Sequence, residues 1–250
     1  MLCKNSLYIC YCLCSCFGRS VILDCHSSSL SSSISSIVAR ISFKTETEYD
    51  EGGSTLTPKQ ITDAIARLMP QDTMVATDVG QHQMWAIQHF HFDYPGQLLT
   101  SGGFGTMGFG LGAAIGAKVG NPEKTVIHIT GDGSFRMNCN ELATEQYYDI
   151  PVITFVFNNN TLGMVRQWQT LIYDKRYSET TLDRAPNFVK LAEAYGLRGK
   201  RVCNVKELEA AITEAMEWKH GYVIDCAIDQ DEMVRPMVGG GSRITQFIID

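Results

Sequence analysis

The chain has 250 residues, of which 44% are hydrophobic and 19% are charged, and its formal net charge at pH 7 is −6. This length allows one large domain or two small ones, and the apolar content is too high for a chain that is disordered throughout. The lack of a basic surplus argues against nucleic acid as a partner, and the lack of an 18-residue apolar run argues against a membrane span.

Residues 1–54 differ in composition from the rest of the chain. Six of the nine cysteines lie within the first 25 residues, and eight serines occupy the ten positions Ser27–Ser36. Such a segment has too little apolar surface to build a core, so it is expected to be disordered or non-native and to precede a folded domain at residues 55–250.

Two other interpretations of this segment stay open. Lys4 followed by a short apolar run and a Ser-rich stretch is typical of a targeting segment. The alternation Cys10-x-Cys12-x-Cys14-x-Cys16 suggests metal, but its spacing is not that of zinc sites. The three remaining cysteines are scattered, which favours a reduced, cytoplasmic domain, or an organelle if the N-terminus directs it there.

Strands and helices are expected to alternate from Thr57 onward. Thr57 and Gln60 form a capping-box pattern around Pro58, which predicts a helix that Pro70 ends. Strands are expected at 73–77, 125–130, 152–157 and 222–228, and helices at 140–148, 188–195 and 205–218, with a Gly-rich loop and tightly packed helix over 102–120. This order predicts an α/β fold, a parallel sheet with helices on both faces.

The glycines Gly103-x-Gly105-x-x-Gly108 match the dinucleotide-binding fingerprint. The acidic residue expected about 20 residues later, at the end of the next strand, is missing. The match is therefore weak evidence for nicotinamide binding, and close packing of a helix explains the glycines equally well.

A stronger pattern joins two consecutive strand ends. Gly131-Asp132-Gly133 follows one predicted strand, and Asn159 follows the next, 27 residues after Asp132. In a parallel sheet, the carboxyl ends of neighbouring strands lie at one edge, where ligands bind. A carboxylate and an amide oxygen are ligands that Mg²⁺ prefers, and Mg²⁺ commonly bridges to phosphate oxygens. The pattern predicts a Mg²⁺–diphosphate site.

Longer motifs identify a resemblance to a known family. Gly131–Asn159 resembles the thiamine-diphosphate signature, and four segments are similar to the catalytic large subunit of acetolactate synthase. These segments are 78–85 (DVGQHQMW), 101–108 (SGGFGTMG), 131–138 (GDGSFRMN) and 163–169 (GMVRQWQ). The resemblance covers about residues 55–250 and implies the diphosphate-binding domain of that family.

The resemblance also implies roles for individual residues. Asp132 and Asn159 would bind Mg²⁺ through side chains, and Thr161 through its backbone carbonyl. Met107, Met164 and Trp168 would act nearest the chemistry: Met107 props the bent cofactor, and Trp168 shapes the pocket for the second substrate. The full set of implied cofactor-binding residues is Gly80, Gln81, His82, Gly105, Met107, Gly131, Asp132, Gly133, Ser134, Asn159, Thr161, Gly163, Met164 and Val165.

The implied reaction is thiamine-diphosphate- and Mg²⁺-dependent decarboxylation of pyruvate and condensation with a second 2-oxo acid. The products are 2-acetolactate, or 2-aceto-2-hydroxybutanoate from 2-oxobutanoate, in branched-chain amino-acid synthesis. A homo-oligomer, at least a dimer, and a small regulatory subunit are implied partners. The family's pyrimidine-binding domain and FAD-binding domain match nothing in this sequence, so the chain alone is expected to be incomplete. A related enzyme such as glyoxylate carboligase, or a non-catalytic cofactor-binding fragment, is the alternative.

Two further groups of titratable residues are interpreted as structural. His89 and His91 fit no common zinc spacing together with His82, and they are expected at the surface or in packing. Glu141 and Glu145 stand one helical turn apart and are expected on a helix surface or at an interface, not as an acid/base pair.

Overall fold

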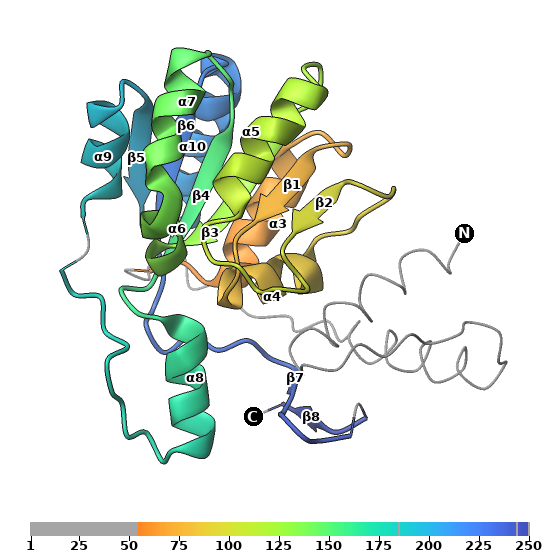
Figure 1. Cartoon of the computed structure of the whole chain (residues 1–250), viewed down its shortest axis with the longest axis vertical. Helices are drawn as coiled ribbons and strands as arrows, with labels where there is room; N and C mark the ends of the chain where they lie inside the picture. Colours follow the sequence, from red (N-terminus) through yellow and green to blue (C-terminus); the bar gives the residue numbers. More distant parts are fainter. Residues whose placement is uncertain (1–54, 185, 244, 250) are drawn as a thin grey trace, which may run out of the picture. The chain divides into compact units, whose positions relative to one another are not determined.

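The computed structural model describes residues 55–249, except 185 and 244 (Figure 1). The predictions for residues 1–54 therefore concern a segment outside the described residues. The described chain divides into two compact units, a larger one with residues 55–101 and 105–233, and a smaller one with 102–104 and 234–249. In the smaller unit, β7 (Met237–Val238) and β8 (Phe247–Ile248) form an antiparallel pair.

The larger unit is built on a parallel sheet, as the sequence predicts, and this sheet has six strands. Its strand order is β2-β1-β3-β4-β6-β5. The strands are β1 (Met74–Thr77), β2 (Leu98–Thr100), β3 (Val126–Gly131), β4 (Ile153–Asn158), β5 (Arg198–Val202) and β6 (Tyr222–Ala227). The central strands β3, β4 and β6 are almost wholly buried because helices cover both faces, which explains their nearly continuous apolar sequences.

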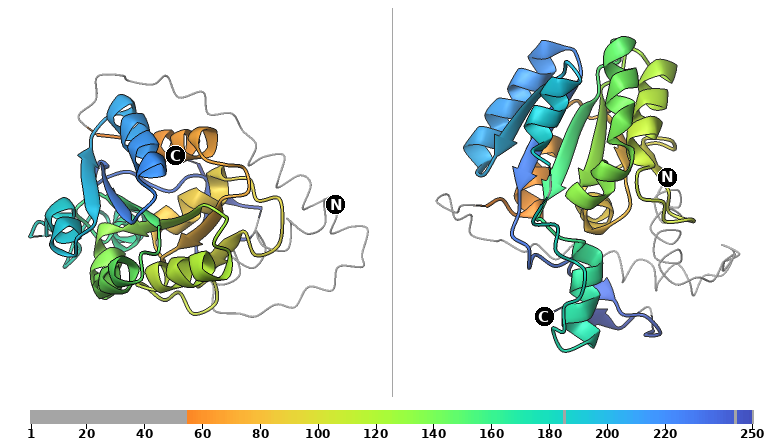
Figure 2. Two further views of the ribbon diagram at one scale, coloured as in Figure 1. Left: turned by 90° about the horizontal axis from the view of Figure 1, so that it is seen from above. Right: turned by 60° about the vertical axis from the view of Figure 1, so that its left-hand side comes forward.

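Helices cover both faces of this sheet. One face carries α5 (Gly110–Gly120), α6 (Asp132–Asn138), a 3₁₀ turn (Cys139–Glu141), α7 (Leu142–Tyr147) and α9 (Phe188–Ala194), and the other carries α3 (Pro58–Leu68), α4 (Gln81–His89) and α10 (Val205–Trp218). Figure 2 shows the two helix layers with the sheet between them. A further helix, α8 (Gly163–Ile172), lies beyond the carboxyl ends of the strands (Figure 1).

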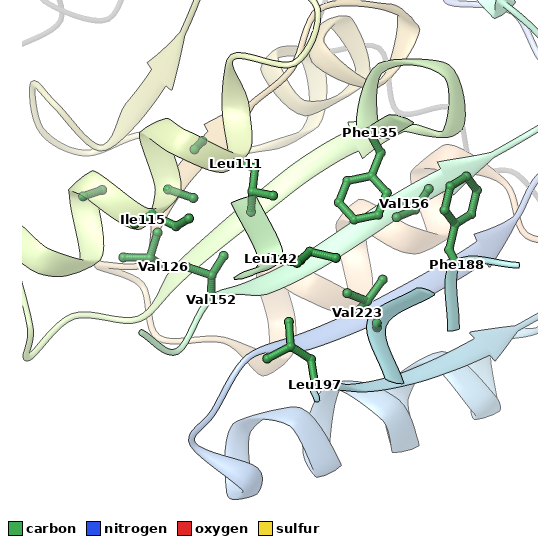
Figure 3. Close-up of a cluster of buried hydrophobic side chains, with 14 of the residues drawn as sticks. Leu111, Ile115, Val126, Phe135, Leu142, Val152, Val156, Phe188, Leu197 and Val223 are labelled. Atoms are coloured by element: carbon green, nitrogen blue, oxygen red, sulfur yellow. The ribbon is translucent and has the colours of Figure 1, made fainter. Parts of the chain in front are cut away.

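The core on the α5 side joins the two halves of the sheet. Leu111 and Leu142 from the helices pack with Val156 and Val223 from the strands, and each is at most 2% exposed (Figure 3). Burying a side chain of this size contributes about 1.5–3 kcal/mol relative to leaving it in water. This core holds the strand ends in fixed positions, which is what a site at their carboxyl edge requires.

Local signals account for some elements and not for others. The capping box is confirmed, because the Gln60 N–H donates to Thr57 Oγ1 at 3.2 Å and the Thr57 N–H donates to Gln60 Oε1 at 2.8 Å. The edge strand β5 was not predicted: its sequence RGKRV is polar, and charged residues on an edge strand hide the usual strand pattern.

The strand order places a switch point between β1 and β3. The strand that follows β1 in the sequence, β2, lies on one side of the β1–β3 pair. The strand that follows β3, β4, lies on the other side. The connections after β1 and β3 therefore run in opposite directions. In open parallel sheets, ligands bind in the crevice at this point, beyond the carboxyl ends of the strands. Within the residues described, no helix has the length and apolar character needed to cross a membrane.

Candidate active site

Three loops meet at the switch point. Gly80–His82 come after β1, Asp132–Ser134 directly follow β3, and Asn159–Thr161 directly follow β4. The strands β1 and β3 are paired through Thr77↔Ile129, and β3 and β4 through Gly131↔Phe157. The predicted site depends on the condition that β3 and β4 are neighbours. This condition is met, and Asp132 and Asn159 directly follow the paired strand ends.

Asp132 is a buried carboxylate with an unused oxygen. The residue is 2% exposed, and its Oδ2 has no hydrogen-bond partner within the described structure. Burial raises the pKa of this carboxyl to about 7, although the N–H groups of Asp132 and Gly133 and the nearby Arg136 act in the opposite direction. A buried acceptor without a partner is costly, and a cation bound there would remove that cost.

Asn159 lies in a cluster of buried amides. Its Nδ2 donates to Gln81 Oε1 at 3.4 Å, and Gln81 Nε2 donates to Gln167 Oε1 at 2.8 Å and to the Glu232 carbonyl at 2.9 Å. These bonds orient the Asn159 amide, and its Oδ1, which accepts from the Thr161 N–H at 3.2 Å, keeps a second lone pair for another contact. Because the Gln81 side chain is engaged with protein groups, its N–H at the start of α4 is the group available to an anion.

The turn after β4 is held by the segment 180–182. The Leu162 N–H donates to the Thr180 carbonyl at 2.7 Å, and the Leu182 N–H donates to the Asn160 carbonyl at 2.8 Å. The Thr161 hydroxyl also donates to the Thr180 carbonyl, at 2.8 Å. The Thr161 side chain is therefore used for structure, and its backbone carbonyl is the group that the resemblance assigns to the metal.

His82 packs across two glycines of the predicted site. A Cβ on Gly131 would stand 2.9 Å from His82 Nδ1, and one on Gly80 would stand 2.7 Å from His82 Cε1, so neither position has room for a side chain. Burial lowers the pKa of His82 to about 4, with the Asp78 charge opposing this effect, so the ring is neutral at pH 7. Its Nε2 has no partner among the described residues.

The Gly105–Gly108 loop contacts the Gly131–Ser134 loop. The Gly108 N–H donates to Ser134 Oγ at 3.2 Å, and Met107 Cε lies 3.9 Å from where a Cβ on Gly133 would stand. Gly105 has φ +66°, a conformation that favours glycine. The loop thus brings the predicted residue Met107 to Gly133, and Gly108 to the predicted residue Ser134.

The helix α8 begins four residues after Asn159. A Cβ on Gly163 would overlap Gln81 Oε1, so the first turn of α8 approaches the amide cluster closely. Met164 and Trp168 are partly buried, and Val165 is 47% exposed. Among the described residues, none of these three side chains joins the hydrogen bonds that connect Gln81 with Asn159, so their roles stay predictions.

Asp78 organises a buried network that the sequence did not assign to any role. Its carboxylate accepts from the Gly110 N–H at 2.5 Å and from Thr130 Oγ1 at 2.6 Å, and it lies 3.5 Å from His128 Nε2. Burial alone would raise the pKa of Asp78, but the His128 ring and the two hydrogen bonds outweigh it and hold that pKa well below its usual range. The aspartate after β1 could have been noticed as a strand-end acid, whereas His128 carries no sequence signal.

The available donors fit Mg²⁺ better than a transition metal. Within residues 55–249, apart from the gaps, no group of three or more His, Cys, Asp or Glu side chains could hold a metal ion. The predicted ligands are one carboxylate, one amide oxygen and one backbone carbonyl, which is an all-oxygen set that leaves positions for phosphate and water.

Of the two placements expected for Glu145, a helix surface or an interface, the surface placement is wrong. The residue is 1% exposed, and a Cβ on Gly221 would contact its carboxyl group, so it lies under the amino-terminal end of β6. Burial raises the pKa of Glu145 well above its usual value. A one-turn spacing of two acids cannot show that one of them faces the sheet.

Gly163→Ala is expected to destabilise the fold by about 1–3 kcal/mol, because the new methyl group displaces the Gln81 side chain. The same variant should also bind cofactor more weakly, since Gln81 orients Asn159. Urea denaturation measures the first effect. Gly116→Ala is the matched control, because it lies in α5 with open space around its Cβ and should stabilise by about 0.5–1 kcal/mol. Equal stability of the two variants would contradict the packing argument.

Comparisons with known proteins identify the family. The model for "Thiamine pyrophosphate enzyme, C-terminal TPP binding domain" matches residues 78–226. The acetolactate synthase large subunit of Haemophilus influenzae is 45% identical over 203 residues, which cover 81% of this chain and 35% of that protein. A probable acetolactate synthase large subunit of Methanocaldococcus jannaschii is 49% identical over 178 residues, covering 71% and 30%.

A solved structure agrees with this assignment. The Rhodococcus jostii thiamine diphosphate-dependent 4-hydroxybenzoylformate decarboxylase superimposes with a TM-score of 0.66 and 26% sequence identity, covering 73% of this chain and 34% of that one. The chain thus spans about a third of the length of the curated relatives it matches. The matched region contains all three loops of the switch point, and the chain belongs to the thiamine pyrophosphate enzymes, as their C-terminal cofactor-binding domain.

Proposed function

We propose that this chain binds thiamine diphosphate through Mg²⁺ held by Asp132, Asn159 and the Thr161 carbonyl. The observation that carries the proposal is the buried Asp132 Oδ2 without a partner, next to an amide oriented by Gln81. The diphosphate would lie against Gly80–His82 and against Gly133 and Ser134. His82 Nε2, which has no partner among the described residues, is the ring atom that we propose contacts the ligand.

The activity that we propose for the protein containing this chain is that of an acetolactate synthase. Its support is the similarity to acetolactate synthase large subunits over most of the chain. When bound, thiamine diphosphate supplies the nucleophilic carbon and the electron sink for removing CO₂ from pyruvate. Gly105 and Met107 would hold the aminopyrimidine end, and Met164 and Val165 would line the space over the thiazolium.

The proposed partners follow from the same assignment. Pyruvate and 2-oxobutanoate are the proposed substrates, and a homo-oligomer with a small regulatory subunit is the proposed assembly. The family's FAD contacts match no residue of this chain, so the proposal assigns it only thiamine diphosphate and Mg²⁺. A cytoplasmic location is proposed, with an organelle as the alternative; the free thiols Cys139, Cys203 and Cys226 suit a reducing compartment.

Calorimetric titration of the full chain with thiamine diphosphate, with and without Mg²⁺, tests the binding proposal. Binding that requires Mg²⁺ is the expected result, whereas no binding by folded protein would contradict it. Product analysis with pyruvate tests the activity. Formation of 2-acetolactate is expected from an enzyme that contains this chain, and CO₂ release with acetaldehyde as the only product would instead indicate a decarboxylase.

Trp168→Leu is expected to change substrate preference in an active enzyme that contains this chain. Loss of the indole alters the pocket that distinguishes one methylene in the second substrate, and such a pocket contributes about 10-fold or more to selectivity. The ratio of 2-aceto-2-hydroxybutanoate to 2-acetolactate, measured with mixed 2-oxo acids, should therefore fall about 10-fold. Trp218→Leu, at the opposite edge of the sheet, is the control. An unchanged ratio in the Trp168 variant would show that Trp168 does not shape this pocket.

A further inference from the structure

Asp225 is a buried carboxylate that the proposed site does not use. It is 2% exposed and lies in β6, between β4 and β5. Its register partners are Val156 in β4 and Arg201 in β5. Strand β4 continues for only two residues beyond Val156 before the turn with the proposed metal ligands begins.

Hydrogen bonds lead from Asp225 into that turn. Arg201 Nη1 donates to Asp225 Oδ2 at 2.6 Å, and Asn158 Nδ2 donates to Asp225 Oδ1 at 2.8 Å. Asn158 Oδ1 in turn accepts from the Asn160 N–H at 3.3 Å. The three side chains therefore form one continuous path from the edge strand to the backbone of the turn.

These contacts fix the conformation of the turn. Both ends of the Asn158 amide are engaged, so the amide can point in only one way. Asn160 has φ +54°, a left-handed conformation that asparagine adopts more readily than most residues other than glycine. The hydrogen bond from its N–H therefore helps to hold Asn159 on one side and Thr161 on the other.

We propose that Arg201, Asp225 and Asn158 form a positioning relay for the metal-binding turn. The proposal rests on the proposed function, because it assumes that Asn159 and Thr161 bind Mg²⁺. Arg201 supplies the charge that a buried carboxylate needs, and the carboxylate holds the amide that sets the turn. Groups that orient metal ligands in this way change metal affinity about 10–100-fold when they are removed.

A purely structural role would give a different result. The pair Arg201–Asp225 also joins β5 to β6, so its loss could lower stability without affecting the turn. Arg198 offers a matched control, since it lies in the same strand and its side chain is 50% exposed, compared with 47% for Arg201. Its guanidinium lies over Trp218 and pairs with Glu214, away from the turn.

The first measurement is the Mg²⁺ concentration that gives half-maximal thiamine-diphosphate binding to the full chain. Arg201→Ala and Asp225→Asn are each expected to raise it about 10-fold, and Arg201→Lys, which keeps the charge, to raise it less. Arg198→Ala should leave it unchanged. Equal values for wild type, Arg201→Ala and Asp225→Asn would overturn the proposal.

The second measurement needs neither metal nor cofactor. Hydrogen exchange of the Asn160 amide should be faster in Arg201→Ala and Asp225→Asn than in wild type or Arg198→Ala, while exchange within β4 is unchanged. If the wild type fails to bind the cofactor with Mg²⁺, the proposed function fails, and the exchange rates still decide the relay. If Asp225→Asn does not fold, Arg201→Ala decides; unchanged exchange in that variant would overturn the relay.

Discussion

Asp132→Asn should abolish Mg²⁺-dependent binding of thiamine diphosphate while leaving the cofactor-free chain at least as stable as wild type. The carboxylate is the only charged group among the three proposed ligands, so its loss is expected to reduce Mg²⁺ affinity by at least about 100-fold. In the cofactor-free chain, however, Oδ2 is a buried acceptor without a partner. A neutral amide there avoids the cost of burying a charge.

The pH dependence of this effect has a definite sign. Folding raises the Asp132 pKa from 3.8 to about 7, so the folded cofactor-free chain holds a proton that the unfolded chain has lost. This contribution to stability is present below pH 3.8 and is lost as pH rises toward 7. Mg²⁺ must displace the same proton, so Mg²⁺ affinity of the wild type should rise with pH up to about 7 and then level off.

Titration calorimetry between pH 5 and 8 measures the Mg²⁺ affinity, and thermal unfolding over the same range measures the stability of the cofactor-free chain. Asp149→Asn is the control, because Asp149 lies at the opposite edge of the sheet, is 68% exposed and has a positive φ that asparagine tolerates. It should bind cofactor like wild type. If Asp132→Asn binds the cofactor at the same Mg²⁺ concentrations as the wild type, Asp132 is not a metal ligand.

The sequence predicted the centre of this site because the relevant residues follow strongly apolar strands. β3 and β4 are recognisable without tertiary information, and the polar residues at their ends must then share an edge of the sheet. Asp132 and Asn159 were predicted as ligands in this way. The same logic failed at β5, where Arg198, Lys200 and Arg201 make an edge strand look like a loop.

The buried polar contacts could not be predicted from the sequence. Gln167 stands in a helix of mixed polarity and resembles a surface residue, yet it is 2% exposed and bonded to Gln81. Glu145 was misplaced for a related reason: a helix with one buried acid has no pattern that distinguishes it from a helix with a solvated one. These residues become visible only when the packing of α8 and α7 against the rest of the fold is known.

Asp78→Ala should destabilise the chain by about 3–5 kcal/mol, the second large effect that we expect. The substitution leaves the Gly110 N–H and the Thr130 hydroxyl without their acceptor in the interior, and it removes the charge beside His128. Asp78→Asn keeps the shape and one acceptor oxygen, so its cost should be smaller. Urea denaturation at pH 7 measures both, with Asp93→Ala as an exposed control.

Acidification provides an independent check on the same carboxylate. Its pKa is lower in the folded than in the unfolded chain, so its charged form stabilises folding above the ordinary value of 3.8. That contribution is lost as pH falls through the lower, folded-state value. Stability of the wild type should therefore fall more steeply below pH 4 than stability of Asp78→Asn. Parallel curves would show that the charge of Asp78 contributes nothing.

The position of Asp78 connects this stability effect to the proposed site. The residue joins the end of β1, which leads to Gly80, with the start of α5, which follows Met107, and with Thr130 in β3. A double-mutant cycle of Asp78→Asn and Thr130→Val isolates one of these bonds, and a coupling of about 1.5–3 kcal/mol is expected for a hydrogen bond to a charged acceptor. Thiamine-diphosphate affinity should fall in both single variants, because loosening either contact frees the loops that converge at the switch point. A large coupling energy with unchanged affinity would show that the network stabilises the sheet without positioning the site.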